Sequence, residues 1–121
     1  MTLQESKTTI SGMEQQLNHQ QAARCLEKLG NPTRLEVYRL LVRAGPDGLA
    51  VGEIQEHLGT PGSTLSHHIS HLVNVGLVHQ RREGRVLRCT PNYALMQRVV
   101  AFLTEECCLG VAGAEVEREA G

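Results

Sequence analysis

The sequence predicts a mostly α-helical fold with one small β-hairpin, in the order helix, helix, helix, helix, strand, strand, helix. Apolar residues recur at helical spacing in five segments. Glu83-Gly84 separates two short runs that read as strands, which is a hairpin signal. A short connection, Gly59–Gly62, joins two of the helices into a helix-turn-helix, and the hairpin beside it is a wing. The predicted fold is therefore a winged helix-turn-helix.

The first two helices are expected over residues 13–29 and 32–43. Gly30 ends the first, in which apolar residues at helical spacing are Ala22, Ala23, Leu26 and Leu29. Asn31 is a good N-cap because its side chain accepts from free backbone amides, and Pro32 suits the first helical position. The second helix has a wide apolar stripe, so we expect it to be central and mostly buried.

The next two helices are the halves of the helix-turn-helix. After a turn at 45–48, a short helix over 51–58 is stopped by Gly59. Thr60-Pro61 repeats the signal of a cap followed by proline and opens a helix over 61–74.

The rest of the chain supplies the wing and a last helix. Strands are expected over 77–81 and 85–90, and the last helix over 93–107. A single domain over 13–109 follows, with a flexible N-terminal arm over 1–12 and an acidic, disordered tail over 110–121.

The net charge of −1 excludes a uniformly basic binder of nucleic acid, but the charges are unevenly distributed. From Glu105 onward, five acidic residues and one arginine sum to −4, which leaves +3 for residues 1–104. Within that part, only Glu83 opposes the arginines of the hairpin, which are Arg81, Arg82, Arg85 and Arg88. Such local clustering indicates a polyanionic partner. Aromatic residues make up only 2% of the chain, which argues against stacking of single-stranded bases.

Other classes of protein are disfavoured by what the chain contains. Residues 1–13 are polar and do not resemble a secretory signal, and the longest apolar run, Val99–Leu103, is far too short to span a membrane. We therefore expect a cytoplasmic protein with free thiols. No cysteine has an evident base and no phosphate-binding loop occurs, so an enzyme is not expected.

The helix over 61–74 divides into an apolar face and a short polar face. The apolar face carries Leu65, Ile69, Leu72 and Val73. The candidate DNA-binding residues are Ser63, Thr64, His67, Ser70 and His71 on this helix, and Arg81, Arg82 and Arg85 on the wing. Short polar side chains can approach base edges in the major groove, and arginine forks match phosphate oxygens. An ordinary solvated face is the alternative.

Three histidines of this helix also suggest a metal site, since ligands at i and i+4 can share one ion. His67 and His71 have that spacing, and His68 points somewhat apart. No Asp or Glu lies between Glu56 and Glu83 to complete such a site, so the sequence disfavours it. His68 is expected to be a partly buried packing residue.

Cys107-Cys108 is the most distinctive chemical feature. Adjacent Cα atoms are too close for an ordinary disulfide, and no His or Lys lies nearby to activate a thiol. A thiophilic ion could still displace the thiol protons, but both sulfurs could reach one atom only if the helix unwinds near Cys108, which Gly110 makes feasible. Two small apolar residues at a helix end are the alternative.

Two further cysteines could each supply a third sulfur. Cys89 alternates with Leu87 on a strand and is most simply a core residue. Cys25 is expected near the apolar face of the first helix, at a subunit contact.

Five motifs, taken in order and spacing, resemble the ArsR/SmtB family of winged-helix, metal-responsive repressors. They are Leu29-Gly30-Asn31-Pro32-Thr33-Arg34-Leu35, Gly52-Glu53-Ile54-Gln55-Glu56-His57-Leu58, Ser66-His67-His68-Ile69-Ser70-His71-Leu72, Gly76-Leu77-Val78 and Arg82-Glu83-Gly84-Arg85. The resemblance implies a homodimer built from the first and last helices. Such a dimer binds double-stranded operator DNA and releases it when an inducer binds.

The cysteine pair is similar to that of the arsenic-responsive branch of this family. The short helix over 51–58 lacks the cysteines of another branch, and residues 93–108 lack the Asp and His ligands of the zinc type. The implied inducer is As(III) or Sb(III) on Cys107 and Cys108, with no permanent cofactor. Some members of the branch have a third cysteine further on, and this chain has none after Cys108, so methylarsenite would suit a two-sulfur site. A repressor that senses thiol oxidation or persulfides on the same scaffold is the alternative.

Overall fold

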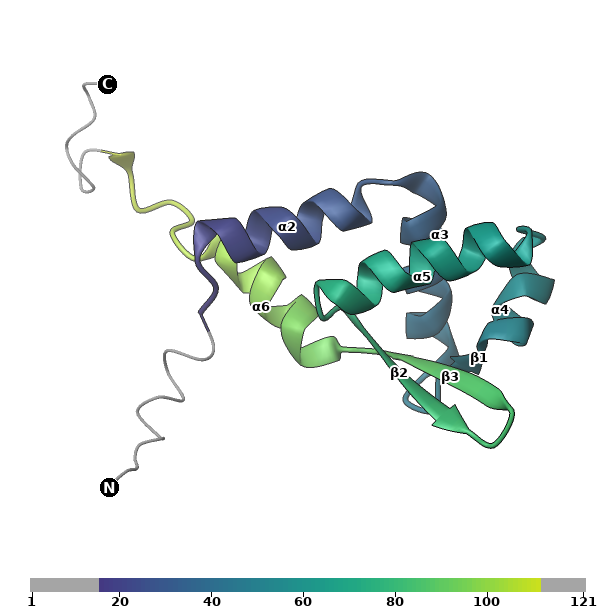
Figure 1. Cartoon of the computed structure of the whole chain (residues 1–121). Helices are drawn as coiled ribbons and strands as arrows, with labels where there is room; N and C mark the ends of the chain where they lie inside the picture. Colours follow the sequence, from purple (N-terminus) through teal and green to yellow (C-terminus); the bar gives the residue numbers. More distant parts are fainter. Residues whose placement is uncertain (1–15, 112–121) are drawn as a thin grey trace.

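The computed structural model describes residues 16–111 of the 121-residue chain. Over this range, five helices and a small antiparallel sheet form the predicted winged helix-turn-helix, and the fold class is confirmed. Figure 1 shows α2 and α6 together at one end of the molecule and the tip of the β2–β3 hairpin projecting at the other. The predicted arm over 1–12 and most of the predicted tail lie outside the described residues.

The first two helices are α2 (His19–Leu29) and α3 (Pro32–Ala44). The predicted start of the first helix at residue 13 is wrong over 16–18, which are not helical. Asn18 is the N-cap: its side chain accepts from the backbone N–H of Gln21 at 2.8 Å, and its own N–H donates to the Gln21 side chain at 3.0 Å. This reciprocal pair satisfies the free amides of the first turn, so the helix begins there. The predicted end of the first helix at Gly30 and the predicted start of the second at Asn31-Pro32 are confirmed.

The helix-turn-helix consists of α4 (Val51–Leu58) and α5 (Gly62–Asn74). Gly59 ends α4 in the left-handed region, at φ 71°, as the sequence indicates. The predicted role of Thr60 as the cap of the next helix is wrong. Pro61 occupies the N-cap position with an extended backbone (ψ 143°), so α5 begins at Gly62, and no side chain caps it.

The sheet has three strands in the order β1-β3-β2, all antiparallel. The hairpin strands are β2 (Val78–Glu83) and β3 (Val86–Pro91), close to the predicted ranges. The sequence did not predict β1 (Leu49–Ala50), whose first residue pairs with Cys89 of β3. A strand of two residues has no alternation to detect, and only its pairing with β3 defines it.

The last helix, α6, covers Tyr93–Thr104 and ends three residues before the predicted end at 107. Beyond Thr104 the backbone forms turns, in which the N–H of Cys107 donates to the carbonyl of Thr104 at 3.0 Å. Cys108 has φ 66°, in the left-handed region. The helix therefore unwinds before the cysteine pair.

The core lies between the helices and the inner face of the sheet. Its fully buried side chains include Leu41, Ile54, Leu65, Ile69, Leu72, Leu77 and Val99. On α6, by contrast, Val100 and Leu103 are more than half exposed. None of the helices within residues 16–111 has the length and apolar character needed to cross a membrane.

Candidate nucleic-acid interface and thiol site

The predicted orientation of the second helix of the helix-turn-helix is confirmed. Its apolar residues Leu65, Ile69 and Leu72 are at most 1% exposed, because they pack into the core. The candidate DNA-binding residues of this helix lie on the opposite side: Ser63, Thr64, His67 and Ser70 are exposed, and His71 is partly exposed. Contact of this face with DNA stays a prediction.

Two histidines of this face contact each other. Nε2 of His67 and Nε2 of His71 are 3.1 Å apart, and the two rings meet edge to face with centroids separated by 4.6 Å. Reduced contact with solvent, followed by the cations Lys28 and Arg34, lowers the pKa of His71. This shift favours the neutral imidazole, which has one donor and one acceptor nitrogen.

His68 points away from this pair and packs against Arg34. Arg34 Nη1 lies 3.2 Å from His68 Nδ1, and Arg34 Nε donates to the carbonyl of Lys28 at 2.6 Å. Partial burial, and then the charge of Arg34, lowers the pKa of His68. The prediction that His68 is a partly buried packing residue is confirmed. Arg34 links the end of α2 to α5, and its only sequence signal was its place in the Asn-Pro-Thr-Arg motif.

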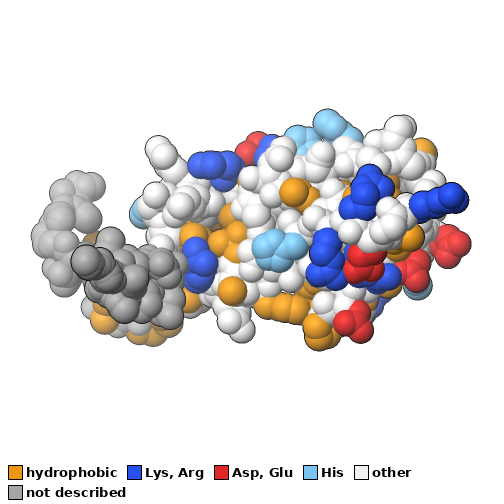
Figure 2. Space-filling model, turned by 60° about the horizontal axis from the view of Figure 1, so that its bottom comes forward, with side chains coloured by type: hydrophobic (Ala, Val, Ile, Leu, Met, Phe, Trp, Pro, Cys, Tyr) orange, Lys and Arg blue, Asp and Glu red, His pale blue; other side chains and the backbone are white. Residues whose placement is uncertain are grey.

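On the wing, Glu83 binds two of the four arginines. It accepts from Arg81 at 2.5 Å and from Arg88 at 3.0 Å, and these two hydrogen bonds hold the pKa of the Glu83 carboxyl below its usual range. Within the described part of the chain, Arg82 and Arg85 form no ion pair. They are therefore the arginines whose charge is available to a polyanion. Figure 2 shows Lys and Arg side chains (blue) gathered at the right-hand end of this face, beside Asp and Glu (red).

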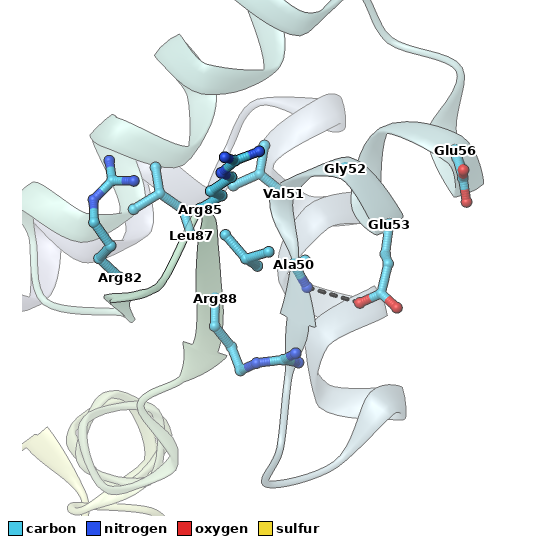
Figure 3. Close-up of a pocket in the computed structure, with 10 residues that line it drawn as sticks. Ala50, Val51, Gly52, Glu53, Glu56, Arg82, Arg85, Leu87 and Arg88 are labelled. Carbon is cyan, nitrogen blue, oxygen red and sulfur yellow. Dashed lines mark hydrogen bonds between the residues drawn. The ribbon is translucent and has the colours of Figure 1, made fainter.

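Arg82 and Arg85 line an open groove of about 670 Å³ between the wing and the start of α4. Figure 3 shows the two arginines on the wing side of this groove and Glu53 and Glu56 on the α4 side. The Glu53 carboxylate accepts from the N–H of Ala50 at 2.8 Å, so it caps α4. The sequence did not indicate that Glu53 and Glu56 would form one side of a groove opposite the wing arginines.

Cys107 and Cys108 are exposed free thiols whose sulfur atoms are 3.3 Å apart. The helix ends at Thr104, and the turns that follow bring the two sulfurs together. This unwinding is the condition predicted from the sequence for a shared ligand. Cys107 also lines a depression of about 540 Å³ at the end of α6. Its wall includes His19 and Phe102, whose rings meet edge to face at 5.1 Å. The sequence did not connect these two aromatic rings with the cysteine pair.

The other two cysteines are buried. Cys89 is fully buried on β3, which confirms it as a core residue, and Cys25 is 3% exposed, with its sulfur 3.9 Å from the carbonyl of Val75. Burial raises the pKa of both thiols. The expected place of Cys25 at a subunit contact is wrong, because its side chain lies inside the protomer. No group of three or more His, Cys, Asp or Glu side chains that could hold one metal ion occurs within residues 16–111, so neither thiol joins the exposed pair in one protomer.

Comparison with known proteins identifies the scaffold. A helix-turn-helix domain model matches residues 29–81. An HTH-type transcriptional regulator of Methanocaldococcus jannaschii is 36% identical over 54% of this chain and 72% of its own length. A crystal structure of an ArsR family transcriptional regulator superimposes with a TM-score of 0.65 and 26% identity, covering 75% of this chain and 91% of that one. The chain belongs to the ArsR family of winged-helix transcriptional regulators.

Other relatives of this chain carry more specific names. A protein of Streptomyces lividans named as a mercury resistance operon repressor is 30% identical over 79% of this chain and 82% of its own length. One of Halobacterium salinarum named as an arsenical resistance operon repressor is 37% identical over 49% of this chain, which spans about half of that relative. A homodimeric winged helix-turn-helix domain from Mycobacterium bovis has a TM-score of 0.56 and 25% identity, and covers 86% of this chain and 92% of its own.

ArsR-family membership confirms the predicted fold and a role in regulating transcription. The family and the fold are those of DNA-binding regulators and not of enzymes. The matched domain, residues 29–81, contains α3, α4 and α5 but ends before the cysteine pair. The family match therefore says nothing about the role of Cys107 and Cys108.

Proposed function

We propose that this chain is a repressor that binds operator DNA as a homodimer and leaves it when trivalent arsenic or antimony binds Cys107 and Cys108. The observation that carries the proposal is the 3.3 Å separation of the two exposed sulfur atoms. Thiolates are the ligands that soft ions prefer. Because Cys25 and Cys89 are buried, the exposed pair is the accessible thiol site of the described chain.

The sulfur separation favours a pyramidal ion over a linear one. For bonds of about 2.3 Å, two sulfurs at a right angle lie about 3.3 Å apart, whereas a linear arrangement needs about 4.6 Å. Trivalent arsenic and antimony have angles near 90°, and two-coordinate Hg(II) is linear. The Halobacterium relative is named for arsenical resistance, which supports a metalloid inducer. The Streptomyces relative is named for mercury resistance, so Hg(II) must be tested beside the metalloids.

The third position on the ion distinguishes between inducers. Within one protomer no third thiol accompanies the pair over residues 16–111. Methylarsenite already carries a carbon substituent at that position, and arsenite would keep an oxygen there. We therefore expect methylarsenite to release DNA at lower concentrations than arsenite.

The DNA-binding half of the proposal rests on the polar face of α5 and on Arg82 and Arg85. In a dimer, two such helices can enter successive major grooves about 34 Å apart. Val100 and Leu103 offer an apolar dimer surface on α6, which contacts α2. The homodimeric Mycobacterium domain supports this assembly.

The inducer site lies at the end of that dimer surface. An ion held by Cys107 and Cys108 constrains the turn that follows α6, and Leu103 is only four residues before Cys107. A change of the turn can therefore alter how two α6 helices pack. A coupling free energy of about 1–3 kcal/mol lowers operator affinity by about 5- to 150-fold.

The test is a titration of protein bound to a fluorescent duplex that was selected for binding from a random library. We expect methylarsenite, arsenite and antimonite to release the duplex, and zinc, cadmium and Hg(II) to do so less well. Cys107→Ser with Cys108→Ser should bind the duplex normally and ignore the metalloids. Cys25→Ala, which removes a buried thiol, is the matched control and should respond like the unaltered chain.

Two results would contradict the proposal. One is a normal response of the double serine variant, and the other is no release by any metalloid. Release by peroxide or polysulfide alone would instead favour the alternative, a thiol redox or persulfide sensor at the same pair.

A further inference from the structure

A pair of imidazole nitrogens on the exposed face of α5 has the geometry of a chelate. His67 and His71 are one helical turn apart, and their Nε2 atoms approach to 3.1 Å. The opposite face of the helix is anchored by Leu65, Ile69 and Leu72, which are buried in the core. The helix backbone therefore fixes the positions from which the two rings project.

We propose that His67 and His71 form a two-nitrogen site for a borderline divalent cation such as Ni(II), Cu(II) or Zn(II). Bonds from zinc to histidine nitrogen are about 2.0–2.1 Å, so two nitrogens at a right angle on one ion lie about 2.9 Å apart. The observed 3.1 Å needs an angle only slightly wider than 90°. Imidazole is a ligand that these ions prefer.

The site consists of two protein ligands and water. His68 does not complete it, because its Nδ1 lies against the Arg34 guanidinium at 3.2 Å. No third His, Cys, Asp or Glu joins the pair in the described chain. The neighbouring cations Lys28 and Arg34 oppose a divalent ion at this position. We therefore expect modest affinity, with ions late in the Irving–Williams order favoured over Mn(II).

The pair changes its hydrogen bonding when the ion binds. In neutral imidazoles at this separation, the Nε2–H of one ring donates to Nε2 of the other. The ion takes the place of that shared proton, which is exchanged through solvent to Nδ1 of the same ring, and each Nε2 lone pair then forms a bond to the metal. Metal binding therefore changes the tautomer of one ring and releases no net proton from the neutral pair.

The site overlaps the face that we propose to contact DNA. An ion on His67 and His71 occupies both imidazole edges, so these rings cannot at the same time hydrogen-bond base edges. We expect the ion and a specific operator to compete. This consequence rests on the proposed function, whereas the metal site itself does not.

The first test measures metal binding without DNA, by calorimetric titration of Ni(II) into the full chain carrying Cys107→Ser and Cys108→Ser. These substitutions remove the competing exposed thiols. We expect one Ni(II) per chain, and a loss of affinity of at least about tenfold in His67→Ala and in His71→Ala. His57→Ala, which removes an exposed histidine of α4, is the matched control and should bind normally. No binding, or binding that His67→Ala leaves unchanged, would overturn the site.

The second test repeats the titration in the presence of the selected duplex. We expect saturating Ni(II) to weaken specific binding by about tenfold, the loss of one good base contact, and to have no such effect on His67→Ala. If saturating Ni(II) left the duplex affinity of the chain with both histidines unchanged, the competition between ion and DNA would be overturned. Failure to bind any duplex, with Ni(II) still bound, would refute the proposed function and leave the metal site standing.

Discussion

Gly48 has a backbone and surroundings that no larger residue can share. It has φ 66°, and a Cβ at this position would lie 1.9 Å from the carbonyl oxygen of Cys89 and 2.7 Å from Cγ2 of Thr90. The close approach exists because the turn after α3 places β1 directly against β3. A glycine is therefore required both by the left-handed conformation and by the contact.

We expect Gly48→Ala to lower the free energy of unfolding by about 3 kcal/mol or more, since it combines left-handed strain with a backbone clash. Gly84→Ala is the matched control: Gly84 has φ 64°, but a Cβ there meets nothing within 4 Å. It should cost only about 1–2 kcal/mol. Urea unfolding followed by circular dichroism measures both, and equal losses would refute the role of the contact.

At the scale of elements, the wing is a hairpin whose charge is set by one carboxylate. The hairpin carries four arginines, and Glu83 forms ion pairs with Arg81 and Arg88. Arg82 and Arg85 have no ion-pair partner within residues 16–111. The position of Glu83 at the end of β2, paired with Val86 across the turn, allows it to reach both partners.

This arrangement predicts opposite effects for two wing variants. Arg85→Ala should weaken DNA binding and reduce the slope of log affinity against log salt by about one, because one phosphate contact is lost. Glu83→Gln should steepen the slope, because it leaves the charges of Arg81 and Arg88 unopposed. Fluorescence anisotropy at several salt concentrations measures both slopes. Arg43→Ala on α3 is the control, and a slope unchanged in Arg85→Ala would remove the wing from the interface.

At the scale of the whole molecule, α6 joins the two halves of the proposed mechanism. It packs Leu95 and Val99 into the core and exposes Val100 and Leu103 on its other side. Its C-terminal end leads directly to the cysteine pair. The same helix therefore borders the core, the proposed partner subunit and the proposed inducer.

We expect Leu103→Glu to break the dimer, because a buried carboxylate without a partner is strongly disfavoured, and to raise the dissociation constant of the dimer by roughly a hundredfold or more. Light scattering after gel filtration should then show single chains at micromolar concentration. Leu35→Glu places the same charge on another exposed leucine, on α3, and should leave the assembly intact. A dimer that survives Leu103→Glu would exclude α6 as its centre.

The sequence by itself determined the order of the five helices and the hairpin over the described range, and the face of α5 that is polar. Caps and glycine stops such as Asn31 and Gly59 act within a few residues, and helical periodicity needs no distant partner, so a local pattern is sufficient. The inward and outward sides of α5 followed from its spacing of apolar residues alone.

Only the tertiary structure decided which of these residues act together. Leu49 pairs with Cys89, and Cys25 is buried, because segments far apart in the chain pack together. The ion pairs of Glu83 with Arg81 and Arg88 depend on side-chain conformation. The approach of the Cys107 and Cys108 sulfurs depends on an early end to α6 that apolar periodicity did not predict. The spacing of residues along a sequence specifies which side of a helix each one faces. The distances between functional atoms are set only when the chain packs.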